Sequence, residues 1–191
     1  MSSRIGISPI IIPNDITIDV IENNDHGSKK ICIKKDKNQM SFDLPKYIDI
    51  DYSSGSGVLK FILDVLHSKN KKSKSMFGTL RSNVNNSVYG LAIGYKVILN
   101  ITGVGYRAEM LTSDIMVLFY GLSHRVNYLP CLGVNLSVSK NGDILVCGHD
   151  KEKVGSTVDD LCKIRNYNIY KGKGIKRSNE TFALKEVKKK K

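Results

Sequence analysis

The stretch GVNLSVSKNGDILVCG, residues 133–148, carries the clearest structural pattern in the second half of this chain. Apolar and polar side chains alternate on both sides of Asn141-Gly142, with the apolar ones at Val134, Leu136, Val138, Ile144 and Val146. Alternation with period two predicts strands, and Asn-Gly between two such runs is a strong hairpin signal. The stretch therefore predicts an antiparallel hairpin.

A helix pattern follows the hairpin directly. Asp150 belongs to the residue types that cap helix N-termini, and the helix is expected to run to about Arg165. Its inner stripe is Val154, Val158, Leu161 and Cys162. This spacing is typical of one apolar helix face.

The first half shows the same order of strands and helix. Two short alternating runs, at 16–20 and 31–33, flank the turn-forming NNDHGS and predict a meander of strands. The run VLKFILDVL, 58–66, is compatible with a strand or with a short helix. Thr79 is then expected to cap a helix that ends near Gly94. Its inner face would be Leu80, Val84, Val88 and Leu91.

This order predicts an α+β fold of two tandem, similar modules, each a mostly antiparallel sheet packed with a helix. Two further runs with period two, 96–111 and 115–122, supply the remaining strands of the second module. The expected boundaries are 1–82 for the N-terminal module, 83–170 for the C-terminal module and 171–191 for a basic extension.

The net charge of +12 is concentrated in two patches. Residues 69–81 hold five basic side chains and no acidic one, and 163–191 hold eleven basic and two acidic ones. Such patches favour a polyanion, because a cation placed near a phosphate releases condensed counterions. A membrane is disfavoured, since KGKGIKR lacks the aromatic or leucine face of an interfacial helix. A solvated charge run is the alternative for each patch.

Metal, cofactor and enzyme chemistry find little support in the sequence. The four cysteines form no C-x-x-C pair, and the histidines show no metal spacing. No run approaches the roughly 18 apolar residues of a membrane span. GVGYRAE, 103–109, lacks the endings of a phosphate-binding glycine loop, so a strand with glycines at bends or close approaches is expected. No cofactor and no small-molecule substrate are predicted.

Six segments, in order and in spacing, resemble the bacterial-type large-subunit ribosomal protein L-six family. They are SRIGISPIIIP from Ser3, GTLRSNVNNSVYG from Gly78, GVGYRAE from Gly103, GLSH from Gly121, DKEKVGSTVDDLCKIR from Asp150 and YKGKGI from Tyr170. The resemblance covers nearly the whole chain. Two positions depart from the family pattern: Tyr167 stands where the family has proline or serine, and Arg125 where proline commonly follows the Ser-His pair.

The resemblance implies a structural role without catalysis. It implies two tandem α+β domains that bind large-subunit rRNA beside the sarcin-ricin loop and the stalk base, with neighbouring large-subunit proteins as further partners. The alternative is an RNA-binding ribosome assembly cofactor or an RNA-acting enzyme. For an enzyme, Asp159-Asp160 is the only adjacent acidic pair outside the residues around Asp150, and adjacent helix residues point to different sides.

The expected rRNA contacts follow the matched motifs and the basic patches. They are Tyr170, Lys171, Gly172, Lys173, Gly174, Lys176 and Arg177; Lys163 and Arg165; Ser123 and His124; Lys71, Lys72 and Lys74; and Lys188, Lys189, Lys190 and Lys191. In YKGKGI, the glycines would let the backbone approach a sugar-phosphate chain while the lysines meet phosphates. Tyr170 would stack on a base or anchor the loop on the core.

Three segments or residues allow two interpretations each. KNKKSKS, 69–75, would be a second RNA contact or a solvated loop. His124 would bond to RNA or to the backbone, and Gly155 would serve close packing or, second to that, close RNA approach. The richness in Ile, Asn and Lys, the absence of tryptophan and a start without a presequence pattern favour an organelle-encoded, mitochondrial protein. A plastid or a bacterial cytoplasm is the alternative compartment.

Overall fold

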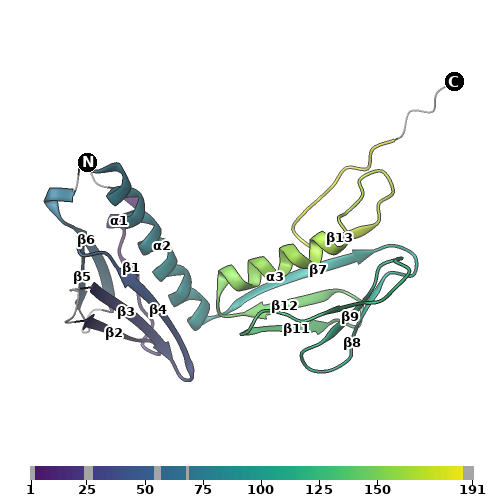
Figure 1. The fold of residues 1–191 in the computed structure, drawn as a ribbon, viewed down its shortest axis with the longest axis horizontal. Helices are drawn as coiled ribbons and strands as arrows, with labels where there is room; N and C mark the ends of the chain where they lie inside the picture. Colours follow the sequence, from purple (N-terminus) through teal and green to yellow (C-terminus); the bar gives the residue numbers. More distant parts are fainter. Residues whose placement is uncertain (1–2, 24–27, 54–56, 68, 187–191) are drawn as a thin grey trace. The chain divides into compact units, whose positions relative to one another are not determined.

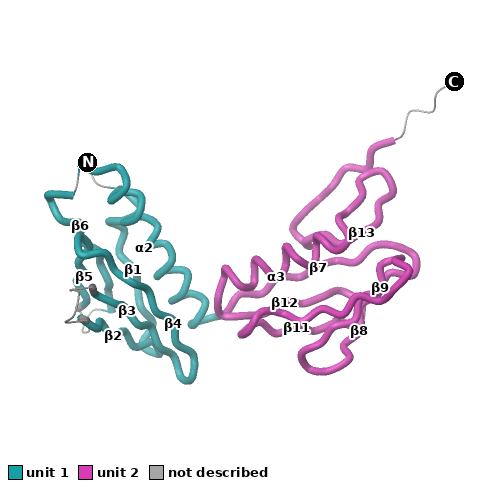
Figure 2. The backbone as a smooth tube through the Cα atoms, viewed as in Figure 1, with its two compact units in different colours: residues 1–93 teal, residues 94–191 magenta. Residues whose placement is uncertain are grey.

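The computed structural model describes residues 3–23, 28–53, 57–67 and 69–186. The chain divides into two compact units, unit 1 at residues 1–93 and unit 2 at 94–191, which Figure 2 shows in different colours. Each unit combines antiparallel sheets, one long helix and a core of its own. The α+β class, with a sheet and a helix in each module, is therefore confirmed.

Unit 1 is built from two three-stranded antiparallel sheets and a long helix (Figure 1). Its elements are α1 Arg4–Ile7, β1 Ile10–Ile11, β2 Thr17–Asn23, β3 Ser28–Lys35, β4 Asn38–Leu44, β5 Ile48–Ser53, β6 Val58–Leu63, the short 3-10 helix η1 Val65–His67 and α2 Lys71–Ala92. The expected meander is confirmed as β2-β3-β4, although its first turn, 24–27, lies outside the described residues. The ambiguous run 58–66 resolves into strand β6 and the beginning of η1.

The inner face of α2 packs on the core as its spacing predicts, with Leu80, Val84, Val88 and Leu91 all buried. The predicted start at Thr79 is wrong. The helix begins at Lys71, because the Asn70 side chain accepts a hydrogen bond from the backbone N–H of Lys72 at 3.1 Å. Thr79 Oγ1 donates instead to the carbonyl of Ser75, inside the helix.

The early start of α2 moves the boundary between the modules. A boundary between residues 82 and 83 would cut one continuous helix whose buried stripe runs from Phe77 to Leu91. The units divide after Ile93, where the helix ends. Gly94 follows with φ +85°, a left-handed conformation that glycine adopts without strain.

Unit 2 contains a four-stranded sheet, a three-stranded sheet and a helix. Its elements are β7 Tyr95–Thr102, β8 Arg107–Met110, β9 Met116–Phe119, β10 Val126–Tyr128, β11 Val134–Val138, β12 Ile144–Gly148, α3 Lys151–Ile164 and β13 Gly174–Arg177. The predicted hairpin is confirmed as β11-β12. Its turn closes with Gly142 N–H donating to the Ser139 carbonyl at 2.9 Å, and Gly142 has φ +85°.

Helix α3 covers one face of the sheet β11-β12-β7-β13 (Figure 1). Asp150 caps it as predicted, accepting from the Glu152 N–H at 2.9 Å. Val154, Val158 and Leu161 are buried against the sheet. The last strand, β13, pairs antiparallel with β7, so the first residues of the expected 171–191 extension are an integral part of unit 2.

Candidate nucleic-acid interface

Residues 166–174, here called the Gly-Lys loop, connect α3 to β13 and are closed by hydrogen bonds to Asn168. Its side-chain oxygen accepts from the N–H groups of Tyr170 at 2.9 Å and Lys171 at 3.1 Å. Its carbonyl accepts from Gly172 N–H at 2.8 Å, and its own N–H donates to the Lys173 carbonyl at 2.8 Å. Four bonds to one residue therefore fix the main chain that carries Lys171 and Lys173.

The glycines of the loop serve the protein's own geometry. A Cβ at Gly174 would lie 2.6 Å from Tyr167 Cα and 2.7 Å from the Asn166 carbonyl oxygen, and φ at Gly174 is +137°. Gly172 has φ +63°, and its Cβ position faces a Leu184 methyl group at 3.3 Å. The sequence predicted that the glycines allow a close approach to the RNA backbone. At Gly174 the close neighbour is instead the protein's own backbone at residues 166 and 167.

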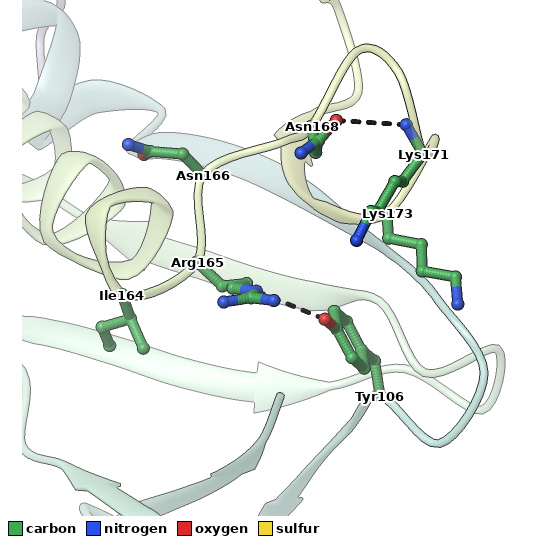
Figure 3. A pocket seen from close by; sticks show the side chains of 7 residues that line it. All are labelled: Tyr106, Ile164, Arg165, Asn166, Asn168, Lys171 and Lys173. Carbon is green, nitrogen blue, oxygen red and sulfur yellow. Dashed lines mark hydrogen bonds between the residues drawn. The ribbon is translucent and has the colours of Figure 1, made fainter. Parts of the chain in front are cut away.

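A cleft of about 420 Å³ lies beside the Gly-Lys loop (Figure 3). We call it the cationic cleft; it is lined by Tyr106, Ile164, Arg165, Asn166, Asn168, Lys171 and Lys173. Three of these side chains are cationic, and none is a carboxylate. The side chains of Arg165, Lys171 and Lys173 make no ion pair with any carboxylate among the described residues. A positive cleft without internal neutralisation suits an anionic ligand.

Tyr106 positions the arginine of the cleft. Its hydroxyl accepts a hydrogen bond from Arg165 Nε at 3.2 Å, as Figure 3 shows. Its ring lies close to the backbone of Gly103 and Gly121, where Cβ atoms would come within 2.8 Å and 3.1 Å of ring carbons, and it packs edge-on against Tyr120 at 5.9 Å. The tyrosine is thereby held from three sides.

The sequence-based prediction missed Tyr106. The motif GVGYRAE was expected to be a strand with glycines at bends, but residues 103–106 connect β7 and β8. Gly103 and Gly105 both have positive φ, +146° and +75°. The sequence offered one signal for a loop of fixed conformation here. Gly103 and Gly105 flank Val104, and Tyr106 follows.

Three further basic residues near the loop, Arg177, Lys163 and Lys176, contact other side chains of unit 2. Arg177 pairs with Asp159, and with Glu180 at 3.4 Å, while Lys163 Nζ lies 3.6 Å from Asp160. Lys176 and Tyr167 form a further contact, with Nζ 5.4 Å from the ring centroid. Internal partners reduce the charge that Arg177 and Lys163 offer to a ligand. They differ in this respect from the three cations of the cleft, which form no ion pair with a carboxylate among the described residues.

Tyr167, one of the two departures from the family pattern, stacks on Phe182 at 5.1 Å and 19°. The segment after β13 therefore returns to the Gly-Lys loop, and the Lys185 N–H donates to the Ile169 carbonyl at 3.1 Å. Arg125, the other departure, lies above the Phe119 ring at 5.3 Å. Both replacements have partners inside unit 2.

Three predicted contacts of unit 2 are exposed but do not line the cleft. Tyr170 is 55% exposed, which leaves its ring available for stacking and gives no support to an anchor in the core. Ser123 and His124 lie in the exposed loop after β9. None of the three is among the residues that line the cationic cleft.

The predicted lysines of unit 1 lie on a helix. Lys71, Lys72 and Lys74 occupy the first turn of α2, so the alternative of a solvated loop at KNKKSKS is wrong, and the RNA contact stays a prediction. Cations there oppose the helix dipole, at about 0.3–1 kcal/mol each when exposed. These lysines belong to unit 1, and the residues that line the cationic cleft all belong to unit 2. The predicted Lys188, Lys189, Lys190 and Lys191 lie outside the described residues.

Within residues 3–23, 28–53, 57–67 and 69–186, no group of three or more His, Cys, Asp or Glu side chains is arranged to hold a metal ion. No helix in the same ranges is both long and apolar enough to cross a membrane.

Comparison with known proteins finds relatives along nearly the whole chain. The large ribosomal subunit protein uL6 of Geotalea uraniireducens is 36% identical over 183 residues, 96% of each chain. The uL6 proteins of Clostridium beijerinckii and of a Methylobacterium species are 35% and 32% identical, over 97% and 98% of this chain and 97% and 99% of their own. No protein-family model matches the chain.

Proposed function

Because the chain belongs to the uL6 family of large ribosomal subunit proteins, we propose that it is a structural constituent of the large subunit and binds large-subunit rRNA through the cationic cleft. The proposed position is near the sarcin-ricin loop and the stalk base, where the protein supports the region that binds translation factors. The observation that carries the proposal is the convergence of Arg165, Lys171 and Lys173 without carboxylate partners among the described residues.

The chemistry of the cleft suits the rRNA backbone. A guanidinium group binds phosphate in a planar, bidentate way, and ammonium groups supply point charges beside it. Arg165 is oriented by Tyr106, and the main chain of both lysines is held by Asn168. Little order has to be imposed on this loop at binding, which reduces the entropic cost of the complex. Tyr170, exposed at the tip of the loop, adds a stacking surface for a base.

A structural role also agrees with the acidic residues nearby. Asp159 and Asp160, the adjacent carboxylates that an RNA-acting enzyme would need, pair with Arg177 and Lys163. The relatives carry the name of a ribosomal subunit protein. Neither observation favours catalysis.

Binding to an rRNA fragment that contains the sarcin-ricin loop, measured across salt concentrations, tests the proposal. Replacing Lys171 and Lys173 with alanine removes two phosphate contacts, so the slope of log K against log salt should become shallower by about 1.4–1.8. A matched control removes Lys140 and Lys153, two exposed lysines of unit 2 outside the cleft. Equal slopes for the Lys171/Lys173 variant and wild type would refute the role of the cleft.

For the compartment we propose the mitochondrial large subunit. The support is compositional, since richness in Ile, Asn and Lys without tryptophan suits an A+T-rich genome; the named relatives are bacterial and would equally suit a bacterial cytoplasm. Immunodetection in purified mitochondria of the source cell tests this, and recovery only from another fraction contradicts it.

A further inference from the structure

A second hollow of unit 2 lies between α3 and β7, on the side away from β12. It has a volume of about 490 Å³, and we call it the edge groove. Four consecutive residues of β7, 95–98, line it together with Val154, Gly155 and Val158 of α3. Successive side chains of a strand point to opposite faces of the sheet. A hollow lined by all four must therefore lie along the edge of the strand.

From Lys96 to Ile98, this edge of β7 is not paired with any of the strands in the described part of the chain. The pairing with β13 ends at Arg177 opposite Leu99, and one further bond joins the Ser178 N–H to the Ile98 carbonyl. The chain then turns, with Glu180 N–H donating to the Arg177 carbonyl. Because hydrogen-bonding groups alternate between the two neighbours of an antiparallel strand, the N–H and C=O of Lys96 point to the same open edge as the Ile98 carbonyl.

Gly155 leaves open space on the part of α3 that lines the groove. Glycine inside a helix is unfavourable relative to alanine, and close packing within the chain was the preferred explanation from the sequence. That explanation is wrong, because a Cβ at Gly155 would have no atom within 4 Å. No other part of the described chain packs against the helix surface at Gly155.

The lining of the groove indicates what fills it. Val97, Val154 and Val158 form an apolar floor, and Ile98 is 41% exposed at the rim. Lys96 and Lys151 are cations of the lining that pair with no carboxylate among the described residues, whereas Arg177, which also lines the groove, pairs with Asp159 and Glu180. An apolar floor beside an unpaired strand edge suits an added polypeptide strand, and the cations are complementary to acidic side chains.

We infer that the edge groove receives an extended segment of a neighbouring polypeptide, which adds to β7 at residues 96–98 in line with β13. Alternate residues of this segment are apolar and lie on the valines, and acidic residues between them meet Lys96 on the opposite face of the sheet. Gly155 remains bare because the backbone of the added segment passes over it. The inference rests on the proposed function, since the neighbour is taken to be a protein of the same subunit.

Site-specific photo-cross-linking in assembled large subunits tests the inference. The full-length chain carries p-benzoylphenylalanine in place of Lys96, and large subunits containing it are purified, irradiated and digested. We expect a cross-link to another polypeptide, within a segment that alternates apolar and acidic residues. Adding Gly155→Phe to the same chain should lower the yield several-fold, because the new side chain occupies the groove. A probe at Lys140, outside the groove, should cross-link equally with and without Gly155→Phe.

A folding control accompanies this experiment. The free chain with Gly155→Ala should keep or raise its melting temperature, since the Cβ enters open space, and Gly155→Phe should keep the wild-type circular dichroism spectrum. If Gly155→Phe fails this control, Gly155→Leu replaces it. A cross-link from Lys96 only to rRNA, to residues 179–191 of the same chain or to a second copy overturns the inference, as does no cross-link. A chain that does not sediment with the large subunit overturns the proposed function as well.

Discussion

Gly174 provides a quantitative test of how the Gly-Lys loop is held. In Gly174→Ala the new Cβ would meet backbone atoms of Asn166 and Tyr167 at 2.6–2.9 Å. These atoms cannot rotate away as the end of a side chain can. At φ +137° the alanine would also be strained, at about 1–3 kcal/mol, and displacing packed atoms adds about 1–3 kcal/mol. The substitution should therefore lower the free energy of unfolding of unit 2 by about 2–6 kcal/mol.

Gly142 is the matched control. It belongs to the same unit and has φ +85°, but a Cβ there would have no atom within 4 Å. Gly142→Ala should cost only the left-handed backbone strain, about 1–2 kcal/mol. Urea unfolding followed by circular dichroism measures both losses on the same transition. Equal losses for the two variants would show that contact with residues 166 and 167 contributes nothing, and the explanation of Gly174 would fail.

Three further predictions concern other parts of the chain. Gly6→Ala would place a Cβ in steric overlap with the buried Phe77 ring, so urea unfolding should show a loss of about 1–3 kcal/mol in unit 1; an unchanged midpoint would contradict the packing of α1 on α2. Asn168→Ala removes the acceptor for two loop N–H groups, so their hydrogen exchange should become faster, and unchanged exchange would exclude the role given to Asn168. Burial raises the pKa of Tyr120 well above its usual 10.0, so the unfolded state ionises first and stability should fall as pH rises above about 10. Tyr120→Phe has no phenol hydroxyl to ionise, so the loss of stability that Tyr120 causes at alkaline pH should be absent from this variant. An identical dependence of stability on pH in the variant and the wild type would refute this role of Tyr120.

The parts of the fold that depend on neighbouring residues were predictable from the sequence. Asn141-Gly142 and Asp150 define a hairpin and a helix start within a few residues, and the stripe from Leu80 to Leu91 identifies the inner face of α2. The start of α2 was not predicted, because its first turn is rich in lysine. Asn70 and Thr79 are both capping residue types, and their hydrogen bonds in the structure distinguish them: Asn70 accepts from Lys72, whereas Thr79 donates to Ser75.

The features of the site that the sequence did not predict depend on contacts between residues that are far apart in the sequence. Arg165 and Tyr106 are separated by 59 residues, and no local pattern connects them. The four residues of β13 become a strand only by pairing with β7. The sequence predicted that YKGKGI matters, but the reason for Gly174 required the position of the Tyr167 backbone.

Sedimentation of the full chain with large subunits, at moderate and at high salt, tests the central claim most directly. The wild-type protein should remain with the large subunit at both salt concentrations. A variant with Arg165, Lys171 and Lys173 all replaced by alanine should be released at lower salt, because its phosphate contacts are lost. Release of the wild type at moderate salt, or a variant that is retained exactly as the wild type is, would contradict the claim that the cationic cleft binds rRNA.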